Sequence, residues 1–175
     1  MPARLPVPAR KPRAGAPPRH RPESFPYKDI RITENFLKEN EELLTAAARF
    51  VLGASFQAPG AIDRDAREAL DALVRTYKSL ESGVYYETMP QSPLAASIVS
   101  AVQQSITQFR QEETQRSGLT RTRDADVLGV LVFLLRMALD EDNGRKYCKR
   151  FLHTLYLHYQ PESSAPAQSP LIVSP

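Results

Sequence analysis

Hydrophobic residues recur every three or four positions through the middle of the chain, which is the spacing of one face of an α-helix. Thr33, Asp63 and Ser92 each precede such a stretch and can accept a hydrogen bond from a free N–H at the start of a helix. A proline follows Ser92 and suits the first position of a helix. The pattern predicts helices at about residues 34–52, 64–81 and 93–117.

Residues 125–139 differ from these stretches because they are apolar around the whole circumference of a helix. The run from Val127 to Leu135 contains one glycine and no charged residue, and Asp124 before it can serve as an N-cap. A helix that is apolar on every side is buried among other helices. With a last amphipathic helix at about residues 145–158, the fold class is predicted to be all-α, an irregular bundle of about five helices around a central hydrophobic helix at residues 125–139.

The composition adds two tails to this bundle. The chain has 175 residues, of which 42% are hydrophobic, enough for one domain with a core of its own. All but three of its 15 prolines lie before residue 27 or after residue 160. We therefore expect a disordered basic tail rich in proline and arginine at residues 1–28, the helical domain at residues 29–160, and a disordered tail at residues 161–175.

The positive charge belongs mainly to the first tail. Residues 1–28 carry seven lysines and arginines against one glutamate, while the whole chain has a net charge of only +3, so the remainder is net acidic. An unfolded basic segment can contact polyanions weakly and without sequence preference. It can equally be a solubilising extension or a proline-rich docking segment. The candidate polyanion contacts in this tail are Arg10, Lys11, Arg13, Arg19 and Arg21.

A second group of cations lies at the start of the last predicted helix. It consists of Arg145, Lys146, Lys149 and Arg150. These residues are the other candidate polyanion contacts, and the last two helices with the turn between them could form a helix-turn-helix. Such a recognition helix usually offers Asn, Gln, Ser or Thr to base edges, and this one offers few. An ordinary solvated face, partly neutralised by the acidic residues 140–142, is the favoured interpretation.

Aromatic residues mark the connection between the second and third predicted helices. Residues 84–91 are expected to run as an extended connection that contains Tyr85, Tyr86 and Met89. Tyrosine and methionine are enriched at protein interfaces, which makes these three residues a candidate interface. The favoured alternative is that they cover the end of the helix at residues 64–81 as a hydrophobic lid.

Catalytic and metal-binding motifs are lacking in the sequence. An EF-hand loop starting at Asp140 would need glycine at its sixth position and glutamate at its twelfth, where the chain has Arg145 and Phe151. Cys148 and His153 are five residues apart, so on a helix their side chains point in different directions. We therefore expect no cofactor and no metal, and an enzyme is the less favoured interpretation.

These observations predict a non-enzymatic helical interaction or regulatory protein that uses the surface of its bundle. The expected partner is an unknown protein or a second copy of the chain. The alternative is a protein that associates weakly and non-specifically with nucleic acid through the basic tail and the basic face of the last helix. A single cysteine and the lack of a long apolar run favour a cytoplasmic location without integral membrane association.

Overall fold

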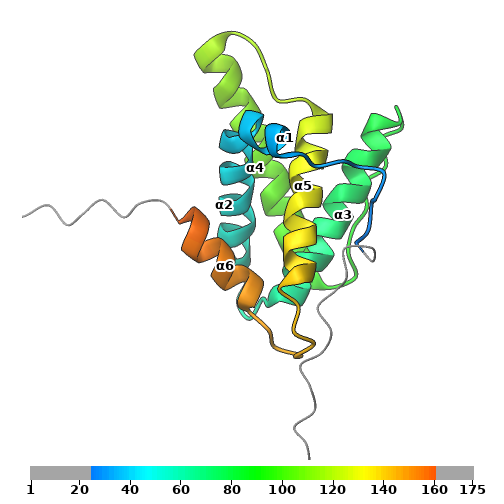
Figure 1. The fold of residues 1–175 in the computed structure, drawn as a ribbon, viewed down its shortest axis with the longest axis vertical. Coiled ribbons are helices and arrows are strands. Elements are labelled where there is room, and N and C mark those ends of the chain that lie inside the picture. The colour runs from blue at the N-terminus through cyan, green and yellow to red at the C-terminus, as the bar shows by residue number, and fades with distance from the viewer. Residues whose placement is uncertain (1–24, 161–175) are drawn as a thin grey trace, which may run out of the picture.

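The computed structural model describes residues 25–160, which form helices joined by short connections (Figure 1). No strand occurs among these residues, so the all-α bundle predicted from the sequence is confirmed. The predicted tail at residues 161–175 and most of the predicted tail at residues 1–28 lie outside the described residues. The helices are α1 (Glu34–Glu39), α2 (Glu41–Gln57), α3 (Asp63–Glu81), α4 (Pro93–Ser117), α5 (Asp124–Asp140) and α6 (Arg150–Tyr159).

Helix α5 is the buried helix that the apolar run predicts. It packs against α3 and α2 and lies between them in the bundle (Figure 1). Val130, Leu131 and Leu134 have no exposed surface. Helix α4 closes the core by packing on α2 and α3, and α6 packs on the outer side of α2. No helix of the part described is both long and apolar enough to cross a membrane.

The first predicted helix is in fact two helices, α1 and α2, so the single helix at residues 34–52 is wrong. Asn40 separates them with φ −110° and ψ 21°, outside the helical region. Its backbone N–H and its side-chain amide both donate to the carbonyl of Phe36, and its own carbonyl accepts from Leu44. Asn40 therefore ends one helix and begins the next, a position that suits asparagine because its side chain bonds readily to nearby backbone. Thr33 caps α1 as predicted, by accepting from the N–H of Phe36.

Two of the predicted N-caps are displaced by one residue. Asp63 and Asp124 are the first residues of α3 and α5 rather than their caps. The carboxylates that bond to backbone at these two helix N-termini belong to other residues. At α3, Asp65 accepts from the N–H of Ile62, and at α5, Asp126 accepts from the N–H of Arg123. The carboxylate of Asp63 is therefore free of a capping role in α3 and bonds instead to the start of α6.

The last helix begins five residues later than predicted. Residues 141–149 form an irregular connection in place of a tight turn, so the helix-turn-helix interpretation is wrong for this segment. Asn143 accepts from the N–H of Arg145, and Gly144 adopts a left-handed φ of 71°, so the backbone is closed into a turn where a helix would start. The N–H groups at the true start of α6 are taken by the carboxylate of Asp63, at 3.0 Å from the N of Phe151 and 3.1 Å from the N of Leu152.

A segment before α1 is tied across the bundle. Tyr27 packs against the core, its hydroxyl donates to Asp71 at 2.8 Å, and burial raises its pKa. The guanidinium of Arg136 on α5 donates to the carbonyls of Tyr27 and Ile30. This segment therefore lies across α5 and α3 (Figure 1).

Candidate interaction surface

An apolar groove opens where the end of α2, the loop after it and the face of α6 meet. Its volume is about 390 Å³, within the usual range of ligand pockets. No aspartate or glutamate is among its lining residues. These are Ser55, Phe56, Ala58, Pro59, Gly60, Ala61, Lys149, Leu152, His153 and Tyr156.

Large apolar side chains stand exposed along the rim of this groove. Phe56 is 68% exposed, and its ring meets the ring of Tyr156 edge to face, with 6.5 Å between the centroids. Leu157 follows Tyr156 on α6 and is 63% exposed, although it is not one of the lining residues. Exposed apolar residues are common singly, but a cluster around a groove is typical of an interaction site.

The local sequence explains why the groove is open. Helix α2 continues past Gly53, where the sequence predicts an end, and so carries Phe56 to its last turn. Beyond it, residues 58–61 are alanine, proline, glycine and alanine, which have no long side chain to fill the space below α6. Gly60 has a φ of 85°, so the chain turns here in a conformation that favours glycine.

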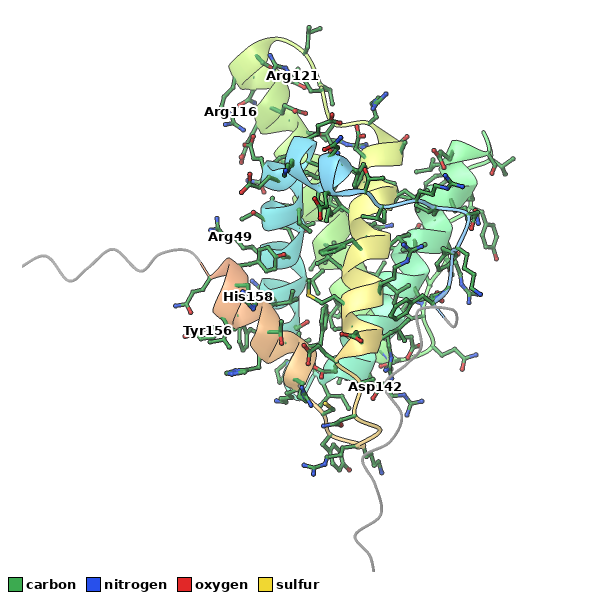
Figure 2. All side chains as sticks on the ribbon, viewed as in Figure 1. Arg49, Arg116, Arg121, Asp142, Tyr156 and His158 are labelled. Carbon is green, nitrogen blue, oxygen red and sulfur yellow. The ribbon has the colours of Figure 1, made fainter. Side chains whose placement is uncertain are left out.

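Helix α6 is held over the groove at both ends. Asp63, which is 6% exposed, binds the first N–H groups of α6, and its own N–H donates to the carbonyl of Cys148 at 3.0 Å. At the other end, the Nε of Arg49 on α2 donates to the carbonyl of Tyr159 at 2.7 Å. In Figure 2, Arg49 lies near Tyr156 and His158, away from Arg116 at the end of α4 and Arg121 in the connection after it. The groove is therefore a fixed feature of the packing between α2 and α6.

The four predicted cations near α6 do not form one helical face. Arg145, Lys146 and Lys149 are exposed residues of the connection before α6, and only Arg150 is helical. Lys146 lies over the ring of Tyr147, and the Nε of Arg150 is 3.3 Å from a carboxylate oxygen of Glu141. The predicted basic face of a helix is therefore wrong as a placement, while Lys149 joins the lining of the apolar groove.

The five candidate cations of the N-terminal tail lie outside the described residues, so polyanion binding there stays a prediction. They are Arg10, Lys11, Arg13, Arg19 and Arg21.

Tyr85, Tyr86 and Met89 lie in the extended connection between α3 and α4, as expected. Their exposed fractions are 66%, 68% and 50%, so they do not cover the end of α3 as a buried lid. The lid interpretation is therefore wrong, because this segment is attached to α3 by hydrogen bonds to Ser79 and Thr76 rather than by burial of its aromatic rings. Their use as an interface stays a prediction.

Groups with metal-ligand chemistry do not gather in the described part of the chain. No three of its histidine, cysteine, aspartate and glutamate side chains are placed to hold one ion. Cys148 is buried at 8% exposure, and His153 faces the groove from α6. The arrangement around the groove therefore offers apolar contact and two basic groups, Lys149 and His153.

No protein-family model, curated protein or solved structure matches this chain.

The sequence patterns did not point to the groove. Phe56, Tyr156 and Leu157 fall outside the apolar stripes that define the buried faces of α2 and α6, so periodicity treats them as incidental. The sequence did hold one indication of an exposed apolar surface. These three residues are large and apolar but lie off the buried stripe of their helix, so they must face solvent. Their grouping depends on how α2 and α6 pack together.

Proposed function

We propose that this protein is a non-enzymatic interaction module that binds an apolar segment of another protein in the groove between α2 and α6. The observation that carries the proposal is the exposed pair Phe56 and Tyr156 at the mouth of a concave apolar site. Protein interfaces depend on a few aromatic side chains that fill pockets of the partner. Here α2 and α6 together present both two exposed aromatic side chains and an apolar groove that a partner's side chain can fill.

The charges around the groove indicate which charge the partner segment should carry. Lys149 and His153 line it, and carboxylates are absent from its lining residues. An acidic residue beside an apolar anchor would therefore meet a cation without facing a like charge. The expected partner segment carries one or two large apolar side chains next to aspartate or glutamate.

The size of the effect follows from the exposed surface of Phe56. An aromatic side chain carries about 150–250 Å² of surface, and about two thirds of that of Phe56 is free to be covered. At about 25 cal/mol per Å² this area is worth about 2.5–4 kcal/mol, and ordering the side chains on binding offsets about 1 kcal/mol, which leaves about 1.5–3 kcal/mol. Loss of this ring should therefore weaken binding about tenfold to a hundredfold.

A random peptide library displayed on phage and selected on the full chain tests the proposal. We expect the selected peptides to share large apolar residues flanked by acidic ones, and their affinity to fall about tenfold to a hundredfold for Phe56→Ala. Leu119→Ala is the matched control, because Leu119 is 70% exposed but lies in the connection between α4 and α5.

The charge requirement is tested with the same peptides. Lys149→Glu should weaken those that carry carboxylates, and the loss should shrink as salt is added. Peptides that bind Phe56→Ala and wild type equally, or a selection that enriches no sequence, would contradict the proposed function.

A further inference from the structure

The connection between α3 and α4 runs back along α3 in an extended form (Figure 1). The N–H of Val84 donates to the carbonyl of Ser79, and the N–H of Thr88 donates to the hydroxyl of Thr76. Between them, the N–H and the carbonyl of Tyr86 both bond to the hydroxyl of Ser79, each at 3.1 Å. Every second residue of the segment Val84–Met89 therefore directs its backbone toward α3.

The other residues of this segment direct their backbone away from the bundle. In an extended chain the N–H and carbonyl of one residue point to the same side, and the next residue points to the opposite side. The N–H groups of Tyr85, Glu87 and Met89 bond to no other residue in the described range 25–160. The segment is no strand of a sheet, but it presents an open backbone edge to solvent beside two exposed tyrosines.

We propose that this edge pairs with the same edge of a second copy of the chain, in an antiparallel two-stranded ribbon between two bundles. Extended backbone is what an open edge binds, through N–H and carbonyl groups that alternate along it. A second copy supplies the same spacing of donors and acceptors, and a two-fold axis satisfies both edges at once. This pairing uses a different surface from the groove and does not depend on the proposed function.

The side chains favour one register of this pairing. With Tyr86 opposite Tyr86 of the second copy, Tyr85 lies opposite Glu87, and each such pair exchanges two backbone hydrogen bonds. The Tyr86 pair is then the closely spaced type, at about 4.5 Å between Cα atoms, in which aromatic side chains interact well. A shift that centres the axis on Glu87 would place two carboxylates opposite each other, which is unfavourable.

Sedimentation of the full chain over rising protein concentration tests the pairing. We expect the average mass to rise from 19.6 kDa toward twice that value. Glu87→Pro removes an outward N–H and leaves the inward bonds of Tyr86 and Thr88 in place, so it should keep the melting temperature and abolish the rise in mass. Glu87→Gln is the matched control, which keeps the N–H and should still dimerise.

Cysteine cross-linking tests the register. Under mild oxidation, Tyr86→Cys should form a disulfide-linked dimer and Glu87→Cys should not, because only residue 86 faces its own copy closely. Wild type supplies the background from the buried Cys148. A wild-type chain that stays at 19.6 kDa at every concentration would overturn the pairing. Cross-linking of Glu87→Cys in place of Tyr86→Cys would overturn the register.

Discussion

Replacing Asp63 with alanine should detach the start of α6 from α3. The carboxylate accepts from the N–H groups of Phe151 and Leu152, and Phe151 has no exposed surface. A buried N–H that loses its acceptor costs about 1–3 kcal/mol, and here two lose it at once. Because water can reach the opened helix end in part, we expect the free energy of unfolding to fall by about 2–4 kcal/mol.

Urea unfolding followed by circular dichroism measures this loss, and amide hydrogen exchange locates it. The amides of Phe151 and Leu152 should lose protection in Asp63→Ala before the core amides of α5 do. Asp63→Asn keeps one acceptor oxygen and should lose about half as much stability. Asp140→Ala is the control, since this exposed aspartate forms no hydrogen bond or ion pair with other residues of the described range, and it should change stability by less than about 0.5 kcal/mol. Equal stability of Asp63→Ala and Asp140→Ala would refute the reasoning.

Two further predictions concern the core. A Cβ at Gly129 would overlap the ring of Phe36, so Gly129→Ala should displace α1 and cost about 1–3 kcal/mol, and in a double-mutant cycle most of that cost should vanish when Phe36→Ala is also present. Burial raises the pKa of the Tyr77 phenol, so the unfolded chain loses this proton first as the pH rises. The contribution of Tyr77 to the free energy of unfolding should therefore be constant below about pH 10 and fall above it, so the total should fall less steeply in Tyr77→Phe in this range; identical slopes would contradict this cause.

The sequence is informative about elements that local patterns determine. The apolar circumference of residues 125–139 identifies the buried helix, and Ser92 with its following proline marks the start of α4, where Ser92 accepts from the N–H of Ala95. The extended connection with Tyr85 and Tyr86 is also expected from its composition and its neighbouring helix ends. In each case the signal lies within a few residues of the element.

The start of α6 is decided by a distant residue. The cations from Arg145 to Arg150 look like the first turns of a helix, but the acceptor for its N–H groups is Asp63, which lies more than 80 positions earlier in the chain. The groove has the same origin, because Phe56 and Tyr156 meet only through the packing of α6 on α2. Periodicity carries no information on such long-range pairs.

We propose the groove between α2 and α6 as the binding surface of this protein. Backbone amide shifts in the isotope-labelled full chain, titrated with a peptide chosen by the library selection, test it most directly. We expect the shifts to concentrate at residues 55–61 and 149–157, and Phe56→Ala to need about tenfold to a hundredfold more peptide to reach them while its melting temperature stays unchanged. Shifts that concentrate elsewhere in the bundle, with these two segments unmoved, would contradict it.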